Sequence, residues 1–262
     1  MKSIQEKIES IQTNGYTLNF ETTFEFALEN YKKIAVYAGL LLLVFIILFS
    51  FLFIGILSSF YDMKTILSFL SQLDKNPESL SVNFLMGYYG FMILTSCILS
   101  PFQAGFLKMA DSGQKGEAFH VSTIFEYYKS PYFASIVLAT LLIALPVMSL
   151  SIVLESYGIK YLGTMISLII SFLTFLTVSL IVFGKLNTFE AIKASFTIMS
   201  KNVFVLLGLL FVSVLLALVG IIGCGVGLVF TLPFMYSMTY AIYTIVIGFE
   251  FEESIENADS LE

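Results

Sequence analysis

The side chains most capable of chemistry lie close together at Glu117, His120 and Glu126. His120 is the single histidine, and Glu117-x-x-His120 has the spacing of a metal-binding pair on a helix. A zinc or di-iron site needs three or four ligands, and the sequence holds no second pair of this kind. The His-Glu-x-x-His motif of metallopeptidases is also absent. We therefore expect no catalytic, cofactor-binding or metal-binding residue, and we interpret His120 as a solvated loop residue.

A second set of polar side chains lies within a long apolar segment, residues 161–184. Their spacing of three, four and three residues places them on one face of a helix. They are Thr164, Ser167, Ser171 and Thr174. Small residues at this spacing let transmembrane helices approach closely, and hydroxyl groups form hydrogen bonds between helices. The stripe therefore indicates either a packing seam or the wall of a polar groove that admits a lipid headgroup.

The composition indicates a membrane protein. Of 262 residues, 58% are hydrophobic and 12% are charged, and the mean hydropathy is +0.91. Such values exceed what the surface of a soluble globular protein tolerates. The net charge of −6 argues against nucleic-acid binding. Cys97 and Cys224 lie within apolar segments, so we interpret them as small buried hydrophobes rather than disulfide or metal ligands.

Six segments are long and apolar enough to cross a bilayer. They lie at about residues 34–60, 83–107, 131–154, 161–184, 203–222 and 227–249. These spans belong to a membrane domain, residues 16–249, between an N-terminal cytoplasmic segment, residues 1–15, and an acidic cytoplasmic tail, residues 250–262. Residues 108–130 are predicted to form a charged loop. Glycines near residues 220–227 predict a tight reversal between the last two spans.

A short amphipathic helix is predicted before the fifth span, over residues 188–201. Its large apolar side chains recur at helical spacing and share one face. They are Phe189, Ile192, Phe196 and Met199. Such helices either lie on the inner leaflet or form a docking platform for a cytosolic partner.

Related helices are predicted before the first and third spans. Thr22-x-x-Glu25 and Thr123-x-x-Glu126 have the pattern of an N-terminal capping box, and Asn187 provides the cap of the third helix. The chain is therefore predicted to contain three repeats, each made of one amphipathic helix and the two spans after it. The predicted fold is an all-α polytopic membrane helical bundle: six transmembrane helices in three hairpins, each preceded by a cytoplasmic amphipathic helix.

The distribution of lysine predicts the orientation of this bundle. Only Lys64, Lys75 and Lys160 of the 13 basic residues fall on the side opposite to the termini. Because cytoplasmic loops carry an excess of basic residues, both termini are expected to be cytoplasmic. We expect a multi-pass protein of the cytoplasmic (inner) membrane.

Several short motifs carry a resemblance to a known family. They are Pro101-Phe-Gln-Ala-Gly105, Glu190-Ala-Ile-Lys-Ala-Ser195, Gly225-Val-Gly227, Pro233 and Tyr240-Ala-Ile-Tyr243. Over about residues 16–249 the chain resembles the broad bacterial family of uncharacterised six-span integral membrane proteins that includes the membrane domain fused to some glycerophosphodiester phosphodiesterases. The resemblance implies the six-span architecture. It implies no activity, because phosphodiesterase chemistry belongs to a separate soluble domain and the family provides no agreed site residues.

Three functional hypotheses follow. The first is a non-catalytic membrane scaffold that contacts lipid or protein partners. The second is a transporter or lipid-handling protein with a cavity between hairpins, which a hydrated cavity at Ser167 and Ser171 would favour over a dry seam. The third, an enzyme, requires Glu117, His120 and Glu126 to converge at the membrane interface.

The expected partners are the lipid bilayer and either a cytosolic or a membrane protein, with no nucleic acid and no cofactor. The spans carry no deep ionisable side chain, which argues against proton coupling.

Overall fold

The computed structural model describes residues 4–60, 62–64, 67, 71, 82–118, 120–157, 159–223 and 226–248, and the regular structure within them is helical. The elements in chain order are α1 (Ile4–Asn14), α2 (Phe20–Phe60), α4 (Val82–Lys115), α5 (Val121–Phe125), η2 (Glu126–Tyr128), α6 (Phe133–Ser156), α7 (Lys160–Leu173), α8 (Thr177–Val182), α9 (Thr188–Lys201), α10 (Val203–Val219), η3 (Gly220–Gly223), α11 (Val226–Thr231) and α12 (Pro233–Ile247). Of the predicted segments, the acidic tail, residues 250–262, lies outside the described residues.

Five stretches of helix within the described residues are long and apolar enough to cross a membrane. They are Phe20–Gly55, Tyr89–Lys115, Phe133–Leu154, Tyr161–Val182 and Gly227–Ile247. A sixth results if α9 and α10, which meet at an angle of 99°, are counted as one bent span. The prediction of an all-α polytopic membrane bundle is confirmed, and the chain is a multi-pass membrane protein.

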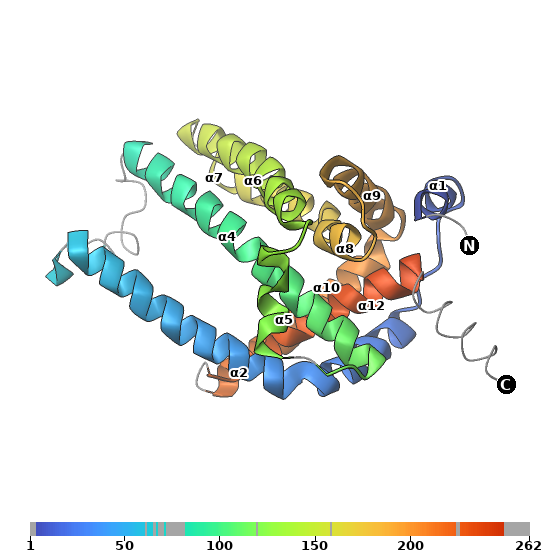
Figure 1. Cartoon of the computed structure of the whole chain (residues 1–262). Coiled ribbons are helices and arrows are strands. Elements are labelled where there is room, and N and C mark those ends of the chain that lie inside the picture. Colours follow the sequence, from blue (N-terminus) through green and yellow to red (C-terminus); the bar gives the residue numbers. More distant parts are fainter. Residues whose placement is uncertain are drawn as a thin grey trace.

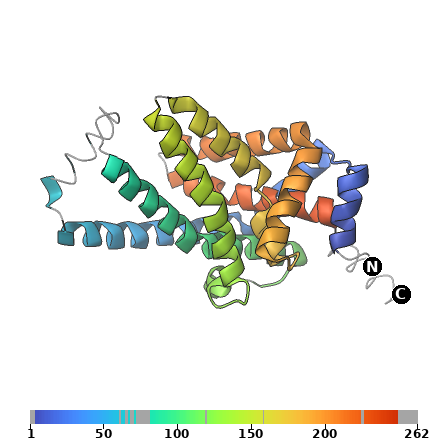
Figure 2. The ribbon, with the colours of Figure 1, turned by 90° about the horizontal axis from the view of Figure 1, so that it is seen from above.

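Helix α12 forms the centre of the bundle and packs against α2, α4, α8 and α10 (Figures 1 and 2). Its side chains are buried along most of its length, including Phe234, Met238 and Ile242. Pro233 begins the helix, where its missing N–H group costs no hydrogen bond. Gly248 ends it in the left-handed conformation, and its N–H donates to Thr244 O at 2.8 Å.

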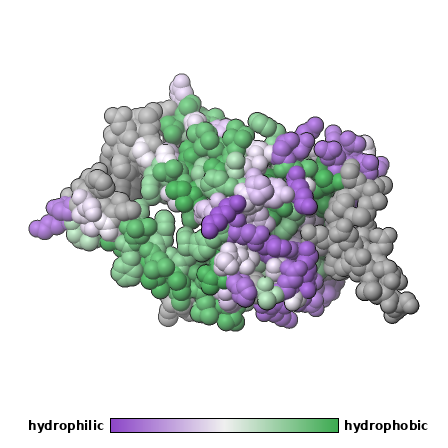
Figure 3. Space-filling view, viewed as in Figure 1, coloured by the Kyte–Doolittle hydropathy of each residue, from purple (hydrophilic) through white to green (hydrophobic). Residues whose placement is uncertain are grey.

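Polar and apolar surfaces are separated along the molecule. Hydrophilic residues gather over the half that holds α1, α5 and α9, whereas hydrophobic residues cover the outer parts of α2, α4, α6 and α7 (Figure 3). In this hydrophobic half α2 and α4 diverge from each other (Figures 1 and 2). Apolar side chains exposed on helices are stable where lipid surrounds them, so the hydrophobic half has the surface expected of a part that contacts lipid.

The three predicted amphipathic segments differ in the structure. Before the first span, the segment and the span form one continuous helix, α2, of 41 residues. Before the third span, α5 and η2 make only a short helical connection. Before the fifth span, α9 is a separate helix with the predicted bounds, Thr188–Lys201.

Two of the predicted helix caps are wrong. Asn19 caps α2 instead of Thr22, because Asn19 Oδ1 accepts a hydrogen bond from Thr22 N at 3.1 Å. His120 is the N-cap of α5, and Thr123 Oγ1 instead accepts from His120 N at 3.1 Å. In both places the true cap lies three residues before the predicted one, and the predicted cap is already helical.

The prediction for α9 is confirmed. Asn187 Oδ1 accepts from Glu190 N at 3.0 Å, and Glu190 Oε2 accepts from Asn187 N at 3.3 Å. These two reciprocal hydrogen bonds form the capping box. The box satisfies backbone donors at the first turn of α9, as the sequence predicts.

The expected charged loop at residues 108–130 is wrong for its first part, because α4 continues as a helix to Lys115. The helix then packs closely on the chain that follows it. A Cβ atom on Gly105 would overlap the backbone of Ile124 in α5. Tyr128 Oη donates to Ile98 O at 2.6 Å, and burial raises the pKa of this phenol. Residues 121–128 are therefore docked along α4 rather than free.

The fourth span is interrupted between α7 and α8, where a single helix was expected. Ser195 of α9 occupies the interruption: its Oγ accepts from Leu176 N at 3.1 Å and donates to Leu173 O at 2.8 Å. Ser195 is fully buried. A neighbouring helix thus supplies the hydrogen bonds that the broken helix lacks, as a membrane-spanning segment requires.

Helix α9 is held firmly within the polar half of the bundle. Thr188 Oγ1 donates to Ser135 O of α6 at 3.1 Å, and Tyr16 Oη donates to Ile198 O at 3.1 Å. Burial raises the pKa of the Tyr16 phenol. The short helix α1 packs over α9. One face of α9 is therefore covered by protein.

The last two spans meet at close range. A Cβ atom on Gly220 would overlap the backbone of Gly227 and Leu228. Thr231 Oγ1 donates to Ala217 O at 2.8 Å and joins α11 to α10. The predicted reversal near residues 220–227 is thus confirmed, since the hairpin depends on glycine at these positions.

Gly105→Ala should destabilise the bundle by about 1–3 kcal/mol, because the added methyl group meets backbone atoms of α5 rather than a movable side chain. Gly90→Ala on the same helix is the matched control, since a Cβ atom there meets open space. The measurement is the midpoint of thermal unfolding in detergent for both variants. Labelling of cysteines such as Cys97 with a maleimide dye reports the unfolding. Equal midpoints for the two variants would contradict the packing described.

Ser195→Ala should destabilise the protein by about 1–3 kcal/mol, because it leaves Leu176 N and Leu173 O buried without their partner. Ser200→Ala is the control, since the Ser200 hydroxyl bonds only to Thr197 O within its own helix. The midpoint of thermal unfolding is again the measurement. A loss no larger than that of the control would show that the interruption needs no hydrogen bonds from α9.

Candidate functional site

A cavity of about 430 Å³ lies between α4, α6 and α7 in the hydrophobic half of the molecule. Helix α6 packs against both α4 and α7, so it forms the floor while the other two helices form the walls. The cavity is open on one side rather than enclosed. Its volume falls within the range of pockets that bind small molecules.

Seven of the residues that line the cavity carry a hydroxyl group. They are Tyr89 and Ser96 of α4, Thr140 and Ser151 of α6, and Thr164, Ser167 and Ser171 of α7. The remaining lining residues are apolar and all belong to α6: Ile143, Ala144, Val147 and Met148. The cavity therefore combines an apolar floor with hydroxyl groups around it. We call this cavity the hydroxyl groove.

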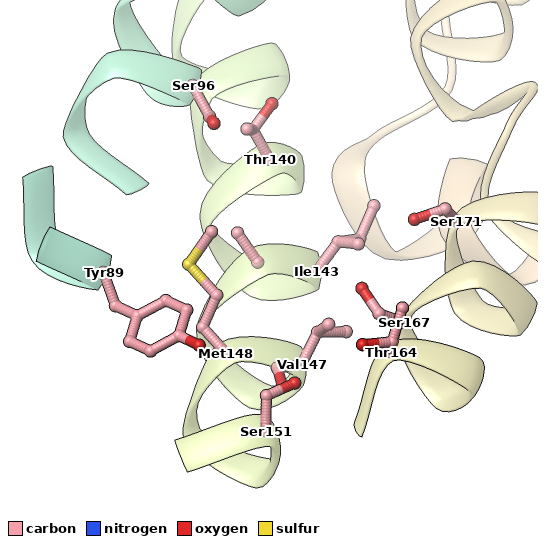
Figure 4. A pocket seen from close by; sticks show the side chains of 11 residues that line it. Tyr89, Ser96, Thr140, Ile143, Val147, Met148, Ser151, Thr164, Ser167 and Ser171 are labelled. Atoms are coloured by element: carbon pink, nitrogen blue, oxygen red, sulfur yellow. The ribbon is translucent and has the colours of Figure 1, made fainter. Parts of the chain in front are cut away.

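The hydroxyl groups on α7 are directed into the groove. Figure 4 shows the oxygens of Thr164, Ser167 and Ser171 on the side of α7 that faces α6. None of these three hydroxyls has a hydrogen bond to a residue that the structure describes, although serine and threonine in helices often bond to the carbonyl four residues earlier. Their donors are therefore available to a molecule in the groove.

The hydroxyl groups on the other walls are partly occupied. Ser96 Oγ donates to Met92 O at 2.8 Å, Thr140 Oγ1 to Ile136 O at 3.0 Å, and Ser151 Oγ to Val147 O at 3.0 Å. Each hydroxyl oxygen keeps a lone pair that can accept a hydrogen bond. The groove thus offers donors on α7 and acceptors on all three helices.

Thr174, the fourth residue of the predicted stripe, lies outside the groove. It follows the last residue of α7, it is 8% exposed, and its Oγ1 donates to Ile170 O at 2.7 Å. The interruption at residues 174–176 ends the regular helix there, so the face extrapolated from Thr164 does not continue. The structure therefore brings three of the four predicted residues together.

The four apolar residues predicted for the interfacial face of α9 have different surroundings. Phe189 is 69% exposed and Phe196 is 38% exposed, Ile192 is partly buried, and Met199 is fully buried. The covered face of α9 is centred on the small residues Ala191, Ala194, Ser195 together with Ile198. Small side chains let helices approach closely, which leaves the bulky phenylalanines outside.

The residues named for the enzyme hypothesis lie on the surface. His120 and Glu126 are exposed on α5 and η2, and Glu117 Oε2 accepts from Ser112 Oγ at 3.3 Å. Within the described ranges, no group of three or more His, Cys, Asp or Glu side chains could hold a metal ion. Cys97 is a free, partly buried cysteine, and Cys224 lies outside the described residues.

A buried carboxylate at the end of α4 was not identified from the sequence. Asp111 is 1% exposed and contacts Lys108 Nζ at 2.7 Å and Lys115 Nζ at 3.1 Å. Tyr240 Oη of α12 donates to Asp111 Oδ1 at 3.1 Å. Asp111 lies beyond the predicted span, residues 83–107, and near the end of the longer candidate span Tyr89–Lys115, so it is buried but not deep within a span.

The cluster around Asp111 connects α4 to its neighbours. Asn30 of α2 donates from Nδ2 to Ala110 O at 2.7 Å, and Lys33 Nζ donates to Gln114 Oε1 at 3.1 Å. A buried carboxylate is costly unless charged and hydrogen-bonding partners surround it, as they do here. We infer that this Asp111 cluster fixes the position of α4 against α2 and α12.

Sequence patterns for the missed residues were present. Lysines three residues before and four residues after Asp111 are the spacings that form ion pairs on a helix. Tyr89 and Ser96 are seven residues apart, so they share a helix face, and Thr140 and Ser151, eleven apart, share another. Each pair resembles the stripe on α7 but contains too few polar residues to be distinctive.

No protein-family model matches the chain, and no curated protein or solved structure matches it. The resemblance to the six-span bacterial family therefore stays a prediction.

Asp111→Asn and Tyr240→Phe should each destabilise the protein, and the double variant should lose less than the sum of the two. The expected coupling energy is about 0.5–3 kcal/mol, because one hydrogen bond joins the two side chains. The free energy of unfolding is measured for the unmodified protein, the two single variants and the double variant, which together form a double-mutant cycle. The control pairs Asp111→Asn with Tyr16→Phe, whose hydroxyl bonds to Ile198 O instead, and these two losses should add. Additive losses for Asp111 and Tyr240 would contradict the contact.

Proposed function

We propose that this chain is a non-catalytic, lipid-handling membrane protein that binds an amphiphilic molecule in the hydroxyl groove. The observation that carries the proposal is the cavity at Ser167 and Ser171. A packing seam would place these hydroxyls against a neighbouring helix, whereas they face an open space of about 430 Å³. The cavity therefore supports the lipid-handling hypothesis over the scaffold hypothesis.

The surroundings of the groove favour a ligand that arrives from the bilayer. Met165, Leu168 and Ile169 on α7 are 60%, 66% and 57% exposed, which is the exposure of a helix that faces lipid. The groove is lined by α4, α6 and α7, whose outer parts belong to this apolar half of the molecule (Figure 3). The aliphatic side chains on its floor suit an acyl chain, while the hydroxyls suit a polar headgroup. Both parts of a lipid thus have a complementary surface.

The location that fits this role is the cytoplasmic membrane, with both termini in the cytoplasm. The support is the lysine distribution, since only Lys64, Lys75 and Lys160 lie on the opposite side of a six-span topology. The segregation of hydrophilic residues over α1, α5 and α9 agrees with an interface at that end. Any further partner, a cytosolic or membrane protein, would reach α9 through its exposed Phe189 and Phe196.

A lipid carrying a diazirine group should label the residues that line the hydroxyl groove when the protein is reconstituted in nanodiscs. Ser167→Leu should reduce this labelling by about tenfold, because the larger side chain fills the space between α6 and α7. Peptide mass spectrometry of labelled protein, with Met148 as the reporter position, is the measurement. Leu168→Phe is the matched control, because residue 168 is on the same helix but faces lipid.

Thermal unfolding of both variants verifies that the bundle is folded. Labelling that spreads evenly over the lipid-facing surface, and that Ser167→Leu leaves unchanged, would contradict the proposed function. Labelling of the groove in Leu168→Phe but not in Ser167→Leu would support it.

A further inference from the structure

Resting on the proposed function, we infer that the hydroxyl groove selects a lipid with an uncharged, hydroxyl-rich headgroup, such as a glycerol or sugar, over a lipid with a phosphate headgroup. The inference concerns the class of ligand, which the proposed function leaves open. It follows from which polar groups line the cavity and from where the charged groups of the molecule lie.

The lining of the groove has no formal charge. Of the 11 residues that line it, seven have a hydroxyl group and four are apolar. Within the part of the chain that the structure describes, no lysine or histidine belongs to this lining. A phosphate group transferred into such a site would lose its hydration without gaining a positive partner, and that transfer is strongly unfavourable.

Two lysines on α4, a helix that forms one wall of the groove, are engaged elsewhere. Lys108 and Lys115 contact the carboxylate of Asp111 at the polar end of α4, whereas Tyr89 and Ser96 line the groove two or more turns nearer the other end of the same helix. The two sites therefore lie on different parts of α4. The hydroxyl groove combines polar groups with an apolar floor and has no charged residue in its lining.

Hydroxyl groups match the groove in number and in kind. A polyol both donates and accepts hydrogen bonds, as does each serine and threonine side chain. Thr164, Ser167 and Ser171 present donors that have no partner among the described residues, along about two turns of α7. A polyol can pair with these hydroxyls both as donor and as acceptor, whereas an ionised phosphate oxygen only accepts and carries a charge that the groove does not balance.

The apolar floor indicates that the polyol is attached to a lipid rather than free. Ile143, Val147 and Met148 would face water beside a bound free sugar, whereas an acyl chain covers them. Free glycerol shares the headgroup chemistry, so the experiment includes it as a separate competitor.

The test uses the full-length protein in nanodiscs and the diazirine lipid as probe, with competitors of identical acyl chains. Diacylglycerol and a monoglycosyl diacylglycerol should compete for groove labelling at concentrations about tenfold lower than phosphatidylglycerol or phosphatidic acid, a difference of about 1.4 kcal/mol. Free glycerol should compete only weakly. In the double variant Ser167→Ala, Ser171→Ala the monoglycosyl diacylglycerol should compete less well, because it loses hydrogen bonds to the groove, while the protein still binds the probe.

A variant that gains a preference for a phosphate lipid provides a test that a loss of folding cannot imitate. Thr164→Lys adds an ammonium group at the exposed edge of the groove and should shift the preference toward phosphatidic acid. Leu168→Lys places the same charge on the lipid-facing side and should leave the preference in the groove unchanged. Equal shifts in both variants would mean that surface charge, rather than the groove, governs selection, and would overturn the inference.

The outcomes separate the inference from the proposed function. If phosphatidic acid competes as well as diacylglycerol in the unmodified protein, the groove binds lipid but the inference about its headgroup is wrong. If free glycerol competes as strongly as diacylglycerol, the ligand is a free polyol and the inference is also overturned. If no lipid competes while the protein is folded, the proposed function itself fails.

Discussion

Backbone N–H and C=O groups within a bilayer have no water to bond, so each interruption of a membrane helix must be completed by the protein itself. The fourth span meets this constraint through Ser195, which bonds to the free groups on both sides of the break between α7 and α8. Since Ser195 belongs to α9, the position of α9 and the course of the fourth span depend on each other. Thr188 and Tyr16 then fix α9 to α6 and to the N-terminal segment.

Close backbone contact is the second means by which the bundle holds together. Gly105 lies against the backbone of Ile124, and Gly220 lies against that of Gly227. Lipid chains are as apolar as leucine, so burial alone gives helices little reason to associate in a bilayer. Small residues allow the dense contacts that replace this driving force. The buried Asp111 cluster in addition fixes how α4 is oriented against α2 and α12, which apolar contacts do not specify.

The sequence predicted the class of fold because long apolar segments and helix periodicity are local properties. It also predicted α9 and its cap at Asn187 to the residue, since that capping box lies within four positions. The interruption at residues 174–176 could not be predicted in this way, because it depends on Ser195, about twenty positions later. Likewise, the stripe on α7 indicated either a seam or a groove. The choice between them depended on the position of α4, which is set by long-range contacts at Asp111 and Asn30.

The interruption of the fourth span also explains how one segment serves two purposes. Five of the six residues of α8 are buried in the core, including Leu180 and Ile181, whereas α7 exposes Leu168 and Ile169 to lipid. The break divides the span into two parts with different neighbours, since α7 packs mainly against α6 while α8 packs mainly against α9. The hydrogen bonds of Ser195 thus hold the end of the helix whose hydroxyls line the groove, from a position outside the groove.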